Sequence, residues 1–214
     1  MADHAERDVI VVEVGPRDGL QNEAQPVPTE RKIAFINALS AAGLPLIEAT
    51  SFVNPRAVPQ MADAGEVMQG ITRYPGVRYP VLVPNERGLD RAINAAVDAI
   101  ALFTAATDEF ARANVGTTIA GTFERFSPVI EQAKARGMWV RGYVSVAFGC
   151  PYAGAVSVDT VTKATSSTPR PAPKNASPTA ARSASLTKRT GSPTAAASLA
   201  SVRCGFHEGG KLGA

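Results

Sequence analysis

The chain has 214 residues, of which 45% are hydrophobic, and a formal net charge of +3. This length fits one domain of ordinary size with a substantial core. The sequence has no apolar run long enough to span a membrane, and its polar N-terminus lacks the apolar centre of a signal peptide, so we expect no membrane partner. The two cysteines, Cys150 and Cys204, are too few for a disulfide framework, which favours a reducing, cytoplasmic location.

The positive charge is concentrated towards the C-terminus. Of the 19 acidic residues, all but one precede residue 164, and residues 164–207 contain neither Asp nor Glu. A basic segment of this kind attracts nucleic acid only without selectivity. We therefore expect no specific nucleic-acid partner.

Residues 9–146 alternate between strand-like and helix-like patterns. The apolar run Val9–Val14 predicts a strand covered on both faces, and Thr29 is expected to cap a helix that Gly43 ends. The other predicted strands are Leu44–Ala49, Val77–Val83, Ala99–Thr104 and Met138–Val146, and the other predicted helices are one carrying Met61 and Met68, then Glu86–Ala96 and Ile119–Arg136. This alternation predicts right-handed crossovers and a parallel α/β sheet, which fits either a doubly wound open sheet or a barrel.

Residues 164–214 have a different composition. Of these 51 residues, 30 are Ala, Ser, Thr or Pro, and large apolar side chains are scarce. Such a segment cannot bury enough apolar surface to offset the entropy of ordering it. We expect the chain to divide into a folded part over 8–163 and a low-complexity tail over 164–214, which is either disordered or translated out of frame.

The first predicted strand leads into a Gly-Pro turn that presents Arg17 and Asp18 side by side. A fixed cation beside a hard oxygen ligand suits chemistry on a metal-bound oxyanion. Glu48 closes the next predicted strand, so all three side chains are expected at one rim of the sheet. On its own, the sequence Pro-Arg-Asp-Gly fits equally well a turn in which Asp18 only stabilises the backbone.

Five sequence blocks, in order and with similar spacing, resemble the 3-hydroxy-3-methylglutaryl-CoA lyase family of metal-dependent lyase barrels. The blocks are RDGLQNE at 17–23, IEATSFV at 47–53, VPQMAD at 58–63, YPVLVPN at 79–85, and VRGYVS at 140–145 followed by FGCPY at 148–152. The resemblance covers about residues 8–163 and favours the barrel over the doubly wound open sheet. A complete (β/α)8 TIM barrel needs roughly 250 residues, so we expect a partial one, about the first five βα units.

The resemblance implies a function and a set of site residues. The family reaction is the divalent-metal-dependent retro-Claisen cleavage of 3-hydroxy-3-methylglutaryl-CoA to acetyl-CoA and acetoacetate, in leucine degradation and ketone-body metabolism. Asp18 matches a ligand of Mg²⁺ or Mn²⁺, and Arg17 matches the residue that binds the acyl-CoA substrate and stabilises its enolate. Gln21 would hold Arg17 or contact substrate, and the catalytic position Glu48 would orient Arg17 or assist proton transfer. Arg141 is interpreted as a structural ion-pair residue, and family members are expected to be homo-oligomers.

The sequence departs from the family pattern in its second half. The family takes two metal-binding histidines from a His-x-His motif and an acid from a cysteine on a late glycine-rich loop, and neither motif occurs here. Cys150 belongs to a different block and is predicted to be a small buried thiol. The alternative function is therefore a truncated or frameshifted remnant of such a lyase without catalysis, and a third hypothesis is a binding module that keeps the CoA or acyl site without turnover. We expect this chain to cleave the substrate at no useful rate.

Overall fold

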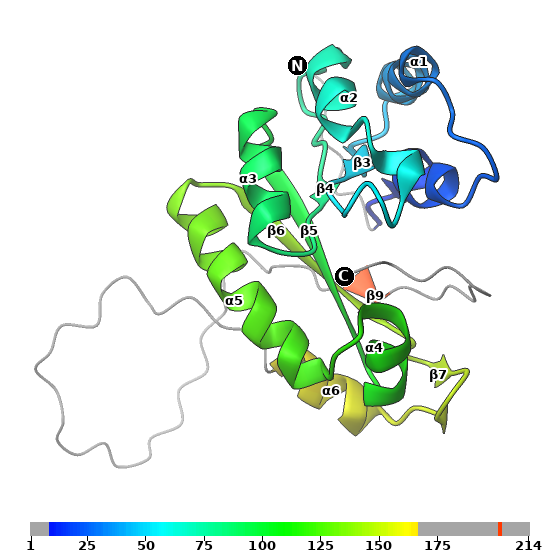
Figure 1. Cartoon of the computed structure of the whole chain (residues 1–214), viewed down its shortest axis with the longest axis vertical. Coiled ribbons are helices and arrows are strands. Elements are labelled where there is room, and N and C mark those ends of the chain that lie inside the picture. The colour runs from blue at the N-terminus through cyan, green and yellow to red at the C-terminus, as the bar shows by residue number, and fades with distance from the viewer. Residues whose placement is uncertain (1–8, 167–200, 203–214) are drawn as a thin grey trace, which may run out of the picture.

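The computed structural model describes residues 9–166 and 201–202 as a curved, mostly parallel sheet with helices along it (Figure 1). The sheet order is β1-β2 and then β3-β4-β5-β6-β9, and every neighbouring pair in it is parallel. The strands are β1 (Val12–Glu13), β2 (Leu46–Ile47), β3 (Thr50–Ser51), β4 (Val81–Leu82), β5 (Ala99–Ala105), β6 (Trp139–Ser145) and β9 (Ser201–Val202). An antiparallel hairpin, β7 (Gly149–Cys150) with β8 (Gly154–Ala155), follows β6.

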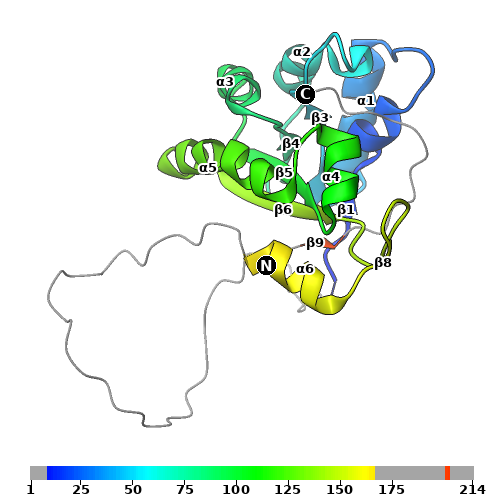
Figure 2. The same ribbon diagram turned by 60° about the horizontal axis from the view of Figure 1, so that its bottom comes forward.

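The main helices cover one face of this sheet, as Figure 2 shows for α2, α3 and α5. Side chains from α1, α2, α3 and α5 share one apolar core with strand residues such as Ile100 and Leu102. Helices on a single face are typical of a barrel wall, whereas a doubly wound sheet is covered on both faces. The helices are α1 (Thr29–Ala41), α2 (Ala64–Gly70), α3 (Glu86–Asn94), α4 (Asp108–Val115), α5 (Ile119–Ala135) and α6 (Val158–Ser166), with shorter turns η1 (Gly15–Gly19) and η2 (Pro59–Met61).

Local sequence explains where several of these elements begin and end. Asn85, Thr107 and Thr118 each cap the following helix by accepting a backbone N–H bond three residues on. Gly43 and Gly137 follow α1 and α5 with positive φ values of 84° and 71°, which glycine adopts without strain. All seven residues of β5 are buried, as expected of a central parallel strand.

The first predicted strand is shorter and more exposed than expected. Val9, Ile10 and Val11 are 75%, 49% and 57% exposed, and the strand itself is only Val12–Glu13. Within the described residues β1 pairs with β2 alone, so one edge of the strand has no neighbour to cover it. The prediction of a strand buried on both faces is therefore wrong for these residues.

The second strand starts and ends two residues later than predicted and is divided into β2 and β3 at Glu48 and Ala49. Its first half, β2, pairs with β1, and its second half, β3, pairs with β4. The backbone N–H of Glu48 bonds to Glu13 on one side, while that of Ala49 bonds to Pro80 on the other. Glu48 thus directly follows β2, as predicted, but the chain continues into β3, so Glu48 lies at the junction of the two parts of the sheet.

Other differences arise where tertiary contacts override local signals. Thr29 is the first residue of α1, after the N-cap Pro28, and its hydroxyl donates to Asp63 at 2.8 Å. Helix α4 and the hairpin β7–β8 were not predicted. Helix α6 continues past residue 163, with Ala164 buried, and β9 pairs with β6. The rest of the predicted tail lies outside the described residues.

Gly88 allows α3 to lie directly on the end of the second strand. A Cβ at this position would meet the Phe52 carbonyl oxygen at 2.9 Å and Pro84 Cδ at 3.0 Å. We expect Gly88→Ala to lower the free energy of unfolding by about 1–2 kcal/mol, because overpacking outweighs the helix propensity gained. Urea unfolding measures this difference.

Gly65, in α2, is the matched control because a Cβ there meets nothing within 4 Å. Gly65→Ala should leave the unfolding free energy unchanged or raise it by up to about 1 kcal/mol. Equal effects of the two substitutions would contradict the assigned contact between α3 and Phe52.

Candidate active site

The tight turn η1, which follows β1, carries Arg17 in a buried position. The backbone N–H groups of Arg17, Asp18 and Gly19 all point at the Val14 carbonyl, at 3.1, 2.7 and 3.4 Å. Pro16 occupies the start of this turn, where its missing N–H costs nothing. Arg17 is in consequence only 5% exposed, although it lies in a loop.

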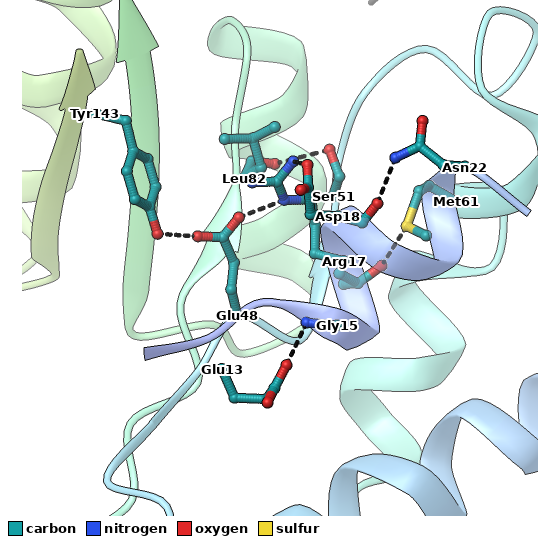
Figure 3. A network of polar contacts seen from close by, with 11 residues as sticks. Glu13, Gly15, Arg17, Asp18, Asn22, Glu48, Ser51, Met61, Leu82 and Tyr143 are labelled. Carbon is teal, nitrogen blue, oxygen red and sulfur yellow. Dashed lines mark hydrogen bonds and ion pairs between the residues drawn. The ribbon is translucent and has the colours of Figure 1, made fainter. Parts of the chain in front are cut away.

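The Arg17 guanidinium contacts two carboxylates (Figure 3). Its Nε donates to Glu48 Oε1, and its Nη1 donates to Asp18 Oδ1 at 2.6 Å. The two carboxylates differ in environment, since the Glu48 side chain is 0% exposed and that of Asp18 is 16% exposed. The structure therefore brings together the three residues that the sequence placed at one rim.

Tyr143 completes this group, and the sequence analysis gave it no role. Its hydroxyl donates to Glu48 Oε2, across 95 positions of sequence. Tyr143 is on β6, where it pairs with Phe103 of β5, and it is 5% exposed. The only signal in the sequence was its place in the block VRGYVS, two residues after Arg141 and hence on the same face of the strand.

Burial and the neighbouring Glu48 carboxylate both raise the pKa of Tyr143 well above its ordinary value, burial being the larger cause. The hydrogen bond to Glu48 acts in the same direction, because it is donated by the neutral phenol. Arg141 and Arg17 oppose these effects. Tyr143 is accordingly a neutral hydrogen-bond donor throughout the ordinary pH range.

Side chains further along the chain fix the segment that carries Arg17 and Asp18. The Asn22 amide donates to the Asp18 carbonyl at 2.6 Å, and the Gln60 amide donates to the Glu23 carbonyl at 2.9 Å. Lys32, 4% exposed, donates to the Gln60 carbonyl at 2.6 Å and forms an ion pair with Asp63 at 2.7 Å. The loop after the Arg-Asp pair is thereby joined to α1 and η2.

Gln21 and Arg141 each carry a buried polar atom that has no hydrogen-bond partner among the described residues. These atoms are Gln21 Oε1 and Arg141 Nε. Arg141 forms no ion pair in this part of the chain, and its guanidinium instead lies 5.0 Å from the centre of the Tyr143 ring. Within the described ranges, Arg141 therefore has no acidic partner that would make it the predicted ion-pair residue.

Cys150 is a free, buried thiol, as predicted. The Thr107 hydroxyl donates to its sulfur at 3.0 Å, which ties the hairpin β7–β8 to the start of α4. The second cysteine, Cys204, lies outside the described residues.

The described residues do not form a complete metal site. Over 9–166 and 201–202 no group of three or more His, Cys, Asp or Glu side chains could hold a metal ion. Asp18 offers one hard oxygen donor, but one carboxylate does not fix a coordination geometry.

Over the described residues, no helix is both long and apolar enough to cross a membrane.

The raised pKa of Tyr143 makes stability depend on pH at the alkaline end. The unfolded chain releases the phenolic proton near pH 10 and the folded chain retains it to higher pH. The stabilisation is therefore fully present below about pH 10 and is lost as pH rises above it, by up to about 1.4 kcal/mol per pH unit. Urea unfolding between pH 8 and 11.5 measures this slope.

Tyr143→Phe should flatten that alkaline slope, and Tyr152→Phe is the matched control because Tyr152 is 63% exposed. A slope that stays the same in Tyr143→Phe would contradict the neutral, buried phenol.

Comparison with known proteins agrees with this geometry. The rat cytoplasmic 3-hydroxy-3-methylglutaryl-CoA lyase is 56% identical over 155 residues, which are 72% of this chain and 45% of that protein. The hydroxymethylglutaryl-CoA lyase structure from Pseudomonas aeruginosa matches with a TM-score of 0.72 at 47% identity, over 73% of this chain and 52% of that one. A lyase from Acinetobacter baumannii, solved with coenzyme A and 3-methylmalate, gives a TM-score of 0.68 at 41% identity, over 72% and 50%.

The chain spans about half the length of the curated relatives it matches, which include both cytoplasmic and mitochondrial enzymes. These neighbours agree with the helix arrangement in assigning the five βα units to a TIM barrel. A sequence model of the HMGL-like family matches residues 8–170, which is most of the chain. This chain therefore belongs to the HMGL-like family, whose relatives found here are hydroxymethylglutaryl-CoA lyases.

Proposed function

We propose that this chain carries the arginine-centred part of a 3-hydroxy-3-methylglutaryl-CoA lyase active site and binds an acyl-CoA there. The reaction of the complete family site is a carbon–carbon cleavage that gives acetyl-CoA and acetoacetate. The observation that carries the proposal is the buried Arg17 guanidinium, held between Glu48 and Asp18 at the end of β1. The neighbour solved with coenzyme A supports the substrate class.

Arg17 is the residue that stabilises the developing negative charge. When the carbon–carbon bond breaks, its electron pair moves onto the thioester carbonyl as an enolate. A guanidinium has five N–H donors, and the described contacts use two of them, to Glu48 and Asp18. The remaining donors are available to the thioester oxygen, in a position fixed before the charge appears.

Glu48 acts as a positioning residue for Arg17 and takes no part in proton transfer. Both of its oxygens are engaged, one by Arg17 and one by Tyr143, and the side chain is fully buried. A general base must reach the proton that it removes. The geometry therefore supports the first of the two roles that the sequence analysis left open.

Gln21 is the candidate substrate-contacting residue beside Arg17. Its buried Oε1 accepts no hydrogen bond within the described part of the chain. A buried acceptor without a partner costs free energy unless a ligand satisfies it. A hydroxyl group of the acyl chain has the donor that this oxygen lacks.

Asp18 supplies one ligand to a divalent cation, Mg²⁺ or Mn²⁺, both of which prefer carboxylate oxygen. The described residues hold no group of three such ligands, so by themselves they do not complete the cation site. When bound, the cation supplies Lewis-acid polarisation of substrate oxygens. We place this function in the cytoplasm and in leucine degradation, within a family whose members are expected to be homo-oligomers.

The first test measures binding of 3-hydroxy-3-methylglutaryl-CoA to the full chain by calorimetry. We expect the double variant Arg17→Gln/Glu48→Gln to weaken binding at least about tenfold, since a charged hydrogen bond is lost. Changing both residues leaves no buried charge without a partner.

Arg112→Gln is the matched control for this test. Arg112 pairs with Asp108 on an exposed helix face, with 58% of its side chain accessible. Binding that is lost equally in both proteins, or that is absent in the wild type, contradicts the proposed function.

The second test measures acetoacetate release by the chain with excess Mg²⁺ or Mn²⁺. We expect no useful turnover, because one carboxylate does not fix the coordination positions that catalysis needs. Asp18→Ala should leave that baseline unchanged. Robust turnover that disappears in Asp18→Ala would instead mean that the chain assembles a complete metal site.

A further inference from the structure

The Glu48 carboxylate is enclosed and has one partner for each oxygen. It is 0% exposed, Arg17 Nε donates to Oε1, and the Tyr143 hydroxyl donates to Oε2 (Figure 3). These partners come from the turn after β1 and from β6, on opposite sides of the second strand. Two donors at two oxygens define the plane of the carboxylate, whereas one donor leaves it free to rotate.

The phenol of Tyr143 is anchored by apolar packing and by a long paired strand. Its ring packs in an apolar cluster with Leu82, Ala101 and Phe103, and β6 pairs with β5 over seven consecutive residues. The Arg141 guanidinium lies over the same ring. Arg17, by contrast, is carried by a short turn. In the series of contacts Tyr143–Glu48–Arg17, the residue anchored by a long strand is therefore Tyr143.

We propose that Tyr143 is a positioning residue for Arg17, holding the Glu48 carboxylate in the plane from which Glu48 orients the guanidinium. This inference rests on the proposed function for the role of Arg17 in acyl-CoA chemistry. The contact chain Tyr143–Glu48–Arg17 is independent of that role. Tyr143 acts through Glu48, so its removal changes the alignment of Arg17 without removing any group that binds substrate.

A purely structural role for Tyr143, as an aromatic core side chain, makes a different prediction. Tyr143→Phe retains the ring and its packing and removes only the donor to Glu48. If only the ring matters, the Tyr143→Phe variant keeps both the fold and the position of the Arg17 guanidinium. If the hydroxyl fixes Glu48, the variant loses the position of the guanidinium while the packing of β5 and β6 persists.

The first experiment needs no ligand. Hydrogen exchange of the Arg17 Nε–H is followed by ¹⁵N NMR in the full chain, with the signal assigned from Arg17→Lys. We expect exchange to be about tenfold faster or more in Tyr143→Phe, as for a weakened bond to a charged group. The exposed Tyr152→Phe is the control and should match the wild type. Unchanged Arg17 exchange in a folded Tyr143→Phe overturns the proposal.

If the Tyr143→Phe protein fails to fold, a second measurement tests the proposal without that variant. ¹³C NMR of ζ-labelled tyrosine follows the phenol of Tyr143 in the wild type and in Glu48→Gln, which keeps the side-chain shape and removes the charge. We expect Tyr143 to titrate at lower pH in Glu48→Gln. Identical titration in both proteins means that the phenol does not bond the carboxylate, and overturns the proposal.

Binding of 3-hydroxy-3-methylglutaryl-CoA separates this inference from the proposed function. We expect Tyr143→Phe and Arg17→Lys each to weaken binding, and the double variant to bind no more weakly than Arg17→Lys, because both act through the same guanidinium. Additive losses in the double variant overturn positioning through Arg17. A wild type that binds no acyl-CoA contradicts the proposed function, and the exchange of Arg17 then decides the role of Tyr143 by itself.

Discussion

The site depends on the burial of a single carboxylate. Glu48 has no solvent contact, and its hydrogen-bond donors among the described residues are Arg17 and Tyr143. Removing one partner of such a buried pair typically costs about 3–5 kcal/mol, because the other charge stays desolvated. The turn after β1, the second strand and β6 must therefore reach their positions together, and each of them fixes the other two.

The sheet supplies the precision that this arrangement needs. In a parallel sheet a shift of one residue turns every side chain to the opposite face. The seven consecutive residue pairs between β5 and β6 define the register that places Tyr143. The interruption of the second strand at Glu48 has a complementary effect, because its two halves bond to different neighbours and the carboxylate lies at the junction. The charged group is thus placed by backbone hydrogen bonds that do not involve its side chain.

Much of the fold and part of the site could be predicted from the sequence. Apolar runs and cap residues located the strands and most helices, since burial and turn chemistry leave local signals. The same signals failed for Val9–Val11, whose burial depends on a neighbouring strand rather than on their own apolarity. Thr29 looked like a helix cap, but its hydroxyl bonds to Asp63, 34 residues away. Arg17 and Asp18 were predictable because adjacent residues in one turn already present both charges.

Tyr143 and the internal position of Glu48 could not be predicted in the same way, because their meaning arises from contacts across the sheet. The local sequence does not indicate which face of β6 is directed at Glu48, which lies 95 positions earlier in the chain. Two carboxylates on one arginine also look equivalent in sequence, yet their environments separate their chemistry. Both Glu48 oxygens accept hydrogen bonds and its side chain is fully buried, whereas the Asp18 side chain is 16% exposed. This difference in burial means that one side of the guanidinium is held by an enclosed acid and the other side by an acid that lies nearer the surface.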